Sequence, residues 1–162
     1  KEMGAMIEVS NEMDSMEPYG DIKVESSYLR NMPVNPVMNP IVIDEFPVLA
    51  VAAAFGSGTF TVESAGELRV KESDRIKGIV QLMDVMGVSV TETANGFSIT
   101  GSTPIKSFTY DSQGDHRLAM SAIVAALASG VEATITNCDC IKTSFPNFFE
   151  ILEELGAKFS AV

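Results

Sequence analysis

Short stretches in which apolar and polar residues alternate recur along the chain, and this period of two predicts β-strands. They lie at residues 6–9, 22–25, 59–62, 88–92, 97–100 and 133–136. Four longer segments carry the apolar residues of helices, at residues 44–55, 73–86, 115–128 and 144–155. Residues 31–40 are polar and contain three prolines, which predicts a loop. Strands that alternate with helices indicate an α/β or α+β fold.

The predicted helices are of two kinds. Residues 44–55 and 115–128 are apolar nearly all round, so each should be buried on most of its faces. Residues 73–86 and 144–155 each carry one apolar stripe, which should pack against a core. Because helices buried all round belong in the middle of a fold, we expect helices inside and sheets outside them.

Polar residues and one proline mark the expected helix starts. Asp44, Asp115 and Ser144 should cap the helices that follow them. Pro47 should lie in a first helical turn, where its missing N–H costs nothing. Gly4 and Gly87, like Gly156, follow helix ends and should adopt the left-handed conformation of a C-cap before a strand.

The same markers recur at similar spacings. The three capping glycines are 83 (87 − 4) and 69 (156 − 87) residues apart. Asp44 and Asp115 are separated by 71 residues (115 − 44), and so are Lys71 and Lys142 (142 − 71). A period near 70 residues fits a whole supersecondary unit rather than a solenoid repeat. We predict one partial domain over residues 1–162, with two pseudo-repeats at about 1–86 and 87–155 and the start of a further strand.

The composition narrows the classes of partner. At 162 residues the chain is about one domain long, and its 46% hydrophobic and 20% charged residues are typical of a globular protein. A net charge of -11 disfavours nucleic acid and anionic membranes, which bind basic surfaces. No uninterrupted apolar run approaches the roughly 20 residues of a membrane span. The start at Lys1, without a methionine or a signal sequence, indicates a piece of a longer protein.

Cysteine and histidine are scarce. Cys138 and Cys140 are the two cysteines, and His116 is the one histidine. This set is too small for a disulfide framework or a zinc site, so we expect two reduced thiols in a cytoplasmic protein.

Charged residues gather in residues 68–75, at the start of a predicted helix. If residues 71–75 are helical, Lys71, Glu72 and Arg75 lie within an arc of about 100°. Cations beside the free N–H groups of a helix start form an anion site, in which Glu72 is either a salt-bridge partner or a proton donor. The alternative is a solvated helix start with local ion pairs.

Two further polar clusters precede helices. His116 and Arg117 follow Asp115 directly before an apolar helix, where the alternatives are a hydrogen-bonded histidine and a buried structural ion pair. Lys142 precedes the capped start at Ser144, where a lone lysine usually has no function. Equivalent helix starts in repeated units tend to face one point, so two lysines, two arginines and two carboxylates are expected to form a pocket for an anionic substrate.

These clusters carry a resemblance to a known family. They read Leu-Arg-Val-Lys-Glu-Ser-Asp-Arg at residues 68–75, Gly-Asp-His-Arg-Leu-Ala-Met at 114–120 and Lys-Thr-Ser-Phe-Pro at 142–146. In this order and spacing, with Asp44 in Ile-Asp-Glu-Phe-Pro upstream, the chain resembles the C-terminal part of the 5-enolpyruvylshikimate-3-phosphate (EPSP) synthase family. The resemblance covers the whole chain.

The resemblance implies an activity and roles for single residues. The family transfers the enolpyruvyl group of phosphoenolpyruvate to the 5-hydroxyl of shikimate 3-phosphate and releases phosphate. The reaction that the resemblance implies calls for no metal or organic cofactor. By resemblance, Asp44 is the proton acceptor and Glu72 the proton donor. Lys71 contacts shikimate 3-phosphate, and His116 adjoins the site. The cations that bind phosphoenolpyruvate are Arg75, Arg117 and Lys142.

The resemblance also implies a fold and an absent half. The family has an inside-out α/β barrel, with repeated β-α-β-α-β units, helices inside and sheets outside, and its active site lies between two domains. The motifs of the N-terminal domain are absent here, so we expect this chain alone to be inactive. By the same resemblance, we expect the full-length protein to be a monomer. Some members have Asn at the position of Glu67, to which no role is assigned. The alternatives are the related UDP-N-acetylglucosamine enolpyruvyl transferase and a non-catalytic binding module of the same fold.

Overall fold

The computed structural model describes residues 1–101 and 104–160. Its strands are β1 (Met6–Met13), β2 (Tyr19–Glu25), β3 (Thr59–Val62), β4 (Ser89–Thr93), β5 (Gly96–Thr100), β6 (Phe108–Asp111) and β7 (Ala133–Thr136). Its α-helices are α1 (Asn39–Val42), α2 (Phe46–Phe55), α3 (Arg75–Met86), α4 (His116–Ser129) and α5 (Phe148–Glu154). Its 3-10 helices are η1 (Pro36–Met38), η2 (Ile43–Glu45), η3 (Gly66–Val70) and η4 (Cys138–Thr143).

The strands form three small sheets. β1 and β2 make an antiparallel hairpin, β3, β5 and β4 make an antiparallel sheet in that order, and β6 pairs with β7 in parallel. All predicted strands before residue 155 are present, but β6 was not predicted. Its four residues contain only two buried apolar positions, Phe108 and Tyr110, too few to establish a period. Pairing with β7, to which α4 connects it, defines this strand.

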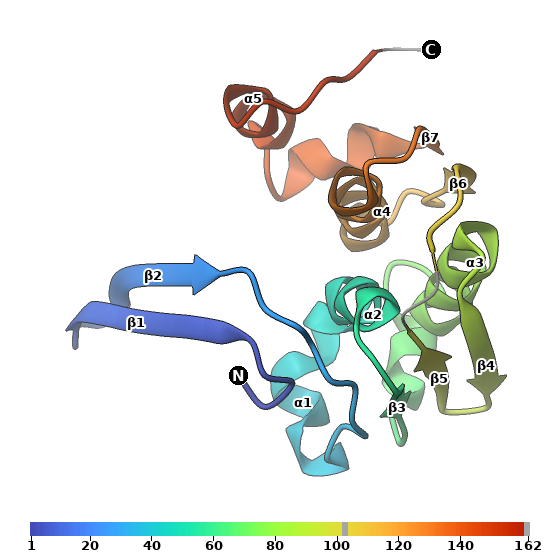
Figure 1. Ribbon diagram of the computed structural model, residues 1–162, viewed down its shortest axis with the longest axis horizontal. Coiled ribbons are helices and arrows are strands. Elements are labelled where there is room, and N and C mark those ends of the chain that lie inside the picture. The colour runs from blue at the N-terminus through green and yellow to red at the C-terminus, as the bar shows by residue number, and fades with distance from the viewer. Residues whose placement is uncertain (102–103, 161–162) are drawn as a thin grey trace.

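Helices α2 and α4 lie in the middle of the molecule, between the hairpin on one side and the remaining sheets on the other (Figure 1). The two helices pack against each other. Alanines at 50, 53 and 54 of α2 and at 119, 122 and 125 of α4 are fully buried, and such small side chains allow close packing of helices. The predicted arrangement of inner helices and outer sheets is therefore confirmed.

Three helices begin later than predicted. Asp44 lies in η2 and does not cap α2, because its carboxylate contacts Arg75 instead. α3 begins at Arg75, so residues 71–74 are not helical, contrary to the supposition made from the sequence. α5 begins at Phe148 and Ser144 does not cap it, since Pro146 disfavours the helical conformation in the residue before it. Asp115 caps α4 as predicted, and Pro47 lies in the first turn of α2.

The structure also differs from the predicted loop at residues 31–40 and from the strand predicted after Gly156. The predicted loop at residues 31–40 becomes helical at its end, where the Asn35 side chain accepts a hydrogen bond from the Val37 N–H and begins η1. The three capping glycines have positive φ angles, as predicted. Residues 157–160, however, form no strand after Gly156. The rest of that predicted strand lies outside the described residues, and the division into two pseudo-repeats stays a prediction.

Among the residues that the structure describes, one helical run is long and apolar enough to cross a membrane by length and composition alone. It covers Pro36–Phe55, 20 residues. The run is divided into η1, α1, η2 and α2, and the side chains of Phe46, Ala50 and Ala53 in α2 are fully buried in the core. We therefore interpret it as part of the protein core.

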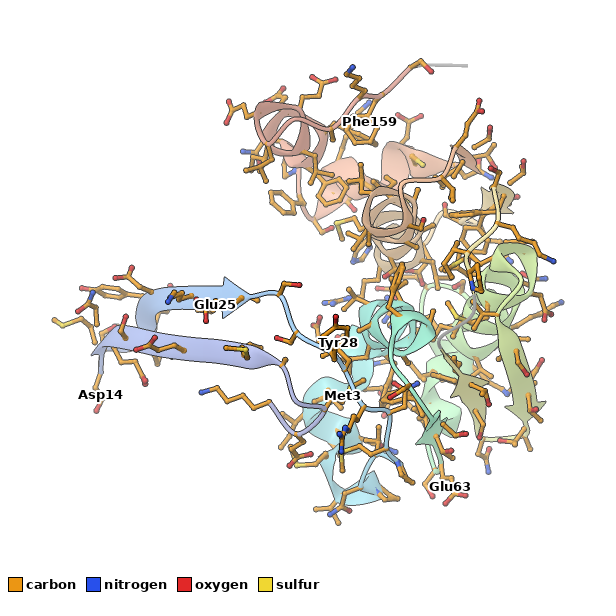
Figure 2. The ribbon with its side chains drawn as sticks, viewed as in Figure 1. Met3, Asp14, Glu25, Tyr28, Glu63 and Phe159 are labelled. Atoms are coloured by element: carbon orange, nitrogen blue, oxygen red, sulfur yellow. The ribbon has the colours of Figure 1, made fainter. Side chains whose placement is uncertain are left out.

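The β1–β2 hairpin projects from this core (Figures 1 and 2). Asp14 marks its outer tip, while Met3 and Tyr28, which flank the hairpin in the sequence, lie at its inner end (Figure 2). Ile22 and Val24 are 68% and 66% exposed on it. The hairpin therefore contributes little to the core that holds the candidate site.

Candidate active site

The predicted site residues lie in or next to helices, most of them near a helix end. Asp44 is in η2, Lys71 and Glu72 follow η3, and Arg75 is the first residue of α3. His116 and Arg117 open α4, and Lys142 lies in η4. Five of these seven residues meet at one point, namely Asp44, Lys71, Glu72, Arg75 and Arg117.

Arg75 is the centre of this cluster. Its side chain is 1% exposed, and each nitrogen of its guanidinium donates to a different carboxylate. Nε lies 2.8 Å from Asp115 Oδ2, Nη1 lies 2.8 Å from Asp44 Oδ1, and Nη2 lies 2.6 Å from Glu72 Oε2. Burial by itself lowers the pKa of Arg75, but the hydrogen bond and charge of Asp115, with the charges of Glu72 and Asp44, more than offset it and raise the pKa. Arg75 therefore stays charged and holds three carboxylates at fixed positions.

Asp115 binds Arg75 on the buried side of the cluster. It is fully buried, and its carboxylate caps α4 by accepting from the backbone N–H groups of Arg117 and Leu118. The same carboxylate accepts from Arg75 and from the Ser73 hydroxyl. Burial opposes ionisation, but these hydrogen bonds and the Arg75 charge prevail and lower the pKa of Asp115. Sequence reasoning assigned it only the cap; its equivalence to Asp44, 71 residues upstream (115 − 44), was the available signal for a larger role.

Lys71 and Arg117 approach Asp44 from two sides. Lys71 Nζ lies 3.8 Å from Asp44 Oδ1 and 2.9 Å from Glu67 Oε1, and the hydrogen bond with Glu67 is the main reason why the pKa of Lys71 is raised. Arg117 Nη1 donates to the Asp44 carbonyl and to Glu45 Oε1, each at 3.0 Å. Glu67 and Glu45 are thus part of the charged network, although the sequence assigned no role to either.

The last two predicted residues lie outside this network. His116 is partly exposed in the first turn of α4, next to Arg117. Lys142 pairs with Asp139 of the same 3-10 helix at 2.9 Å, and its side chain is 70% exposed. In the described part of the chain, Lys142 is not among the cations that contact Asp44, Glu72 or Asp115. The expected convergence of two lysines is therefore not found, because η4 directs Lys142 to a local partner.

This geometry presents two carboxylates to solvent on one rigid support. The side chains of Asp44 and Glu72 are 43% and 52% exposed, while the guanidinium between them is buried. Two carboxylates at separate, fixed positions can serve as a base and an acid on either side of a reacting group. Three cations share the cluster with five carboxylates, so an anion that binds here must displace a carboxylate or meet further cations.

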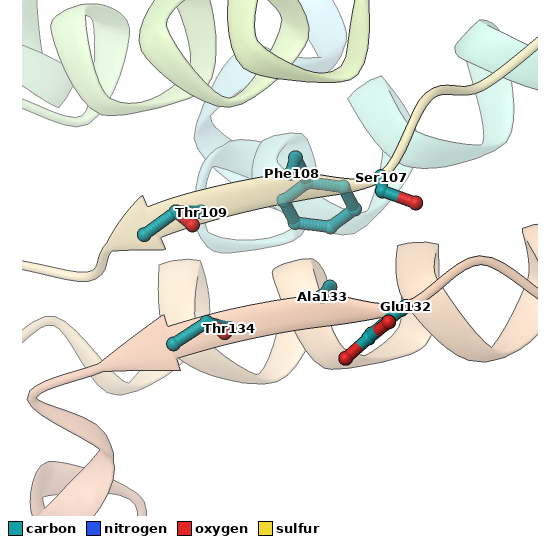
Figure 3. Close-up of a pocket in the computed structure, with 6 residues that line it drawn as sticks. All are labelled: Ser107, Phe108, Thr109, Glu132, Ala133 and Thr134. Atoms are coloured by element: carbon teal, nitrogen blue, oxygen red, sulfur yellow. The ribbon is translucent and has the colours of Figure 1, made fainter. Parts of the chain in front are cut away.

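Two depressions in the described part of the chain lie apart from this cluster. A depression of about 260 Å³ runs along the first residues of β6 and β7, which lie side by side (Figure 3). It is lined by Ser107, Phe108, Thr109, Glu132, Ala133 and Thr134. A wider one of about 580 Å³ lies at the other end of these strands, beside Asp111, Asn137 and Cys140. Neither contains a predicted site residue, and among residues 1–101 and 104–160 no group of three or more His, Cys, Asp or Glu is placed to hold a metal ion.

Comparison with known proteins decides the family. A family model described as EPSP synthase (3-phosphoshikimate 1-carboxyvinyltransferase) matches residues 1–152. The chain belongs to the EPSP synthase family. It is 46% identical over 156 residues to the 3-phosphoshikimate 1-carboxyvinyltransferase of Synechococcus sp., a match that covers 96% of this chain and 35% of the relative. The enzyme of the same name from Geobacter metallireducens is 44% identical over 157 residues, with 96% and 37% covered. The chain therefore spans about a third of the length of these relatives.

Solved structures agree with the EPSP synthase family. An EPSP synthase from Acinetobacter baumannii superposes with a TM-score of 0.85 at 35% identity, and the match covers 94% of this chain and 36% of that one. The enolpyruvyl transferase NikO from Streptomyces tendae superposes with a TM-score of 0.71 at 18% identity, covering 95% and 33%, which shows the fold alone. The fold is thus that of the enolpyruvyl transferases, as a partial domain of mixed α/β units.

Proposed function

We propose that this chain is the C-terminal part of a longer cytoplasmic enzyme that transfers the enolpyruvyl group of phosphoenolpyruvate to the 5-hydroxyl of shikimate 3-phosphate. The observation that carries the proposal is the geometry at Arg75. One buried guanidinium holds Asp44 and Glu72 on its two terminal nitrogens, so both carboxylates face solvent at fixed positions. The family membership supplies the reaction that these carboxylates serve.

The proposed chemistry needs a base and an acid on opposite sides of the reacting bond. Asp44 accepts the proton of the 5-hydroxyl as its oxygen adds to the enolpyruvyl carbon, and Glu72 delivers a proton to the methylene carbon. Phosphate then leaves while Glu72 takes back a proton from the methyl group so formed, which restores the double bond of the enolpyruvyl ether, and the proton held by Asp44 leaves with the phosphate. Lys71 contacts shikimate 3-phosphate, while Arg117 and Lys142 bind phosphoenolpyruvate beside His116. Arg75 joins them when the substrate displaces Asp44 or Glu72 from its guanidinium.

The charges of the cluster explain why this chain alone should be inactive. Its cations are already paired: Arg75 with three carboxylates, Lys71 with Glu67 and Arg117 with Glu45. Two phosphates and a carboxylate on the substrates need more positive charge than this cluster leaves uncompensated. We infer that those cations come from the part of the longer protein that this chain does not include.

The test measures phosphate release from phosphoenolpyruvate and shikimate 3-phosphate by the longer gene product and by this chain in parallel. Glu72→Gln should lower kcat by about 10² to 10⁴-fold, since it removes an acid but keeps the shape. Glu67→Gln is the control, because Glu67 is also an exposed glutamate of the charged network, 67% against 52% for Glu72, but it pairs with Lys71 rather than with Arg75. We expect it to retain activity within a few-fold and this chain to release no phosphate. Turnover by this chain, or equal effects of the two substitutions, would contradict the proposal.

A further inference from the structure

Arg69 and Asp74 are the two charged residues of the 68–75 cluster to which the proposed chemistry assigns no part. Arg69 makes the larger number of side-chain hydrogen bonds. It lies in η3, and its side chain is 27% exposed. Its guanidinium makes four hydrogen bonds. Nε donates to the Ala94 carbonyl at 2.8 Å, and Nη2 donates to the Thr93 carbonyl at 2.7 Å and to Glu92 Oε1 at 2.8 Å. Nη1 donates to Asp74 Oδ2 at 2.8 Å. Arg69 therefore ties η3 to the turn between β4 and β5 and to the start of α3.

The hydrogen bond from Arg69 to Asp74 connects Arg69 to the start of α3. Asp74 is the N-cap of α3, and its Oδ1 accepts from the backbone N–H of Lys77 at 3.0 Å. Arg69 holds the second oxygen of the same carboxylate. The carboxylate is thus fixed at both oxygens, and with it the residue at which α3 begins. Because Arg75 follows directly, this fixes the direction in which its side chain leaves the helix.

The anchors at Arg69 and Asp74 enclose the segment that carries two proposed site residues. Between them lie Lys71 and Glu72, in irregular backbone without helical hydrogen bonds. A loop segment of this kind is held in place by its ends and by its side-chain contacts. Glu72 reaches Arg75 and Lys71 reaches Asp44 from this segment. A shift of either end would move both side chains relative to Arg75.

We propose that Arg69 is a positioning residue for the reaction, which sets the places of Lys71 and Glu72 through Asp74 and the β4–β5 turn. This inference rests on the proposed function for its kinetic consequence, but not for its structural one. A planar guanidinium with several donors in fixed directions is required, because a lysine ammonium cannot reach Glu92, Asp74 and the two carbonyls together. Arg69→Lys should therefore behave much like Arg69→Gln.

The test compares Arg69→Gln and Arg69→Lys with Tyr110→Phe. Tyr110 donates to the Gly78 carbonyl of α3, so its loss weakens the same helix without touching the segment at residues 71–74. In the longer gene product we expect Arg69→Gln to lower kcat about 10- to 100-fold and to raise the KM for shikimate 3-phosphate, since small misplacements of catalytic groups have effects of this size. Tyr110→Phe, at a similar loss of thermal stability, should leave both parameters nearly unchanged.

A second measurement does not depend on activity. Amide hydrogen exchange on this chain should show a selective acceleration at Lys77 in both Arg69 variants, because its N–H loses an ordered Asp74 cap. If the unmodified longer protein has no turnover, the proposed function fails while the exchange result still tests the positioning. Unchanged Lys77 exchange overturns the inference, and so do kinetic losses that Tyr110→Phe reproduces or that Arg69→Lys fully restores.

Discussion

At the scale of single residues, the site depends on one buried arginine and the carboxylate beneath it. Arg75 and Asp115 are 1% and 0% exposed, so neither charge is solvated by water and each must be compensated by the protein. The two terminal nitrogens of Arg75 hold Asp44 and Glu72 at the surface. The residues that stabilise the site, Arg75 and Asp115, are therefore buried, while the two carboxylates proposed for the chemistry are exposed.

The buried pair predicts a dependence of stability on pH. The pKa of Asp115 is lowered from 3.8, so its contribution to the free energy of unfolding is complete above that value and is lost as the pH falls through the lower folded pKa. We expect Asp115→Asn to cost about 2 kcal/mol at pH 7, because Arg75 loses a charged partner while asparagine still caps α4. The variant should also lose less stability than the unmodified chain below pH 4. Urea unfolding at several pH values measures both effects.

Asp139→Asn is the control for this experiment. Asp139 pairs with Lys142, and its side chain is 95% exposed, so solvent screens the pair. We expect no measurable change in stability at pH 7 and an acid response like that of the unmodified chain. Equal effects of the two substitutions would show that the buried pair does not stabilise the fold.

At the scale of elements, the interiors of helices and strands followed the sequence pattern better than their ends did. The apolar stripe of α3 and the alanine-rich faces of α2 and α4 are buried where the periodicity placed them. The starts of α2 and α3 differ from prediction because side-chain partners outside each helix bind the residues that precede it, whereas α5 begins late because of Pro146. Asp44 bonds to Arg75 rather than to its own helix, and Ser73, at which the second helix was predicted to begin, bonds to Asp115 outside α3.

Because α3 packs closely against α4, replacing a glycine of α3 by alanine should have an unusual effect on stability. Gly78 is buried in α3, and a Cβ there would lie 2.3 Å from Leu118 Cδ1 of α4. Alanine in a helix interior normally adds up to about 1 kcal/mol relative to glycine. Here we expect Gly78→Ala to lower stability by about 1–2 kcal/mol instead, because the buried leucine must move within a packed core. Lys77→Ala, at an exposed position of the same helix, should change stability little, and thermal melts of both variants compare the two effects.

At the scale of the whole molecule, packing is uneven. In the described part of the chain, β1 and β2 pack substantially only on each other, whereas α2, α3 and α4 join the two other sheets into one core. Regions with few buried apolar contacts open at lower free energy than the core. The hairpin should therefore be the first part of this chain to open.

Limited digestion with trypsin tests this difference. Lys23 lies in β2 with a side chain 65% exposed, and Lys77 lies in the first turn of α3. We expect cleavage after Lys23 well before any cleavage within α3, with rates read by mass spectrometry. Lys23→Gln should remove the early product without altering the later ones. Cleavage at both positions at the same rate would mean that the chain opens as a single unit.

The sequence by itself determined the family, the order and type of most elements and the identity of the candidate site residues. These depend on local periodicity and on short motifs, which are properties of neighbouring positions. Only the tertiary structure decided the role of Asp115, the bonding of Arg69 and the separation of Lys142 from the other cations. Arg75 meets Asp44 and Asp115 across 31 and 40 positions of the chain. Which of many carboxylates pairs with a cation at such a distance depends on how the helices pack, and no local pattern records it.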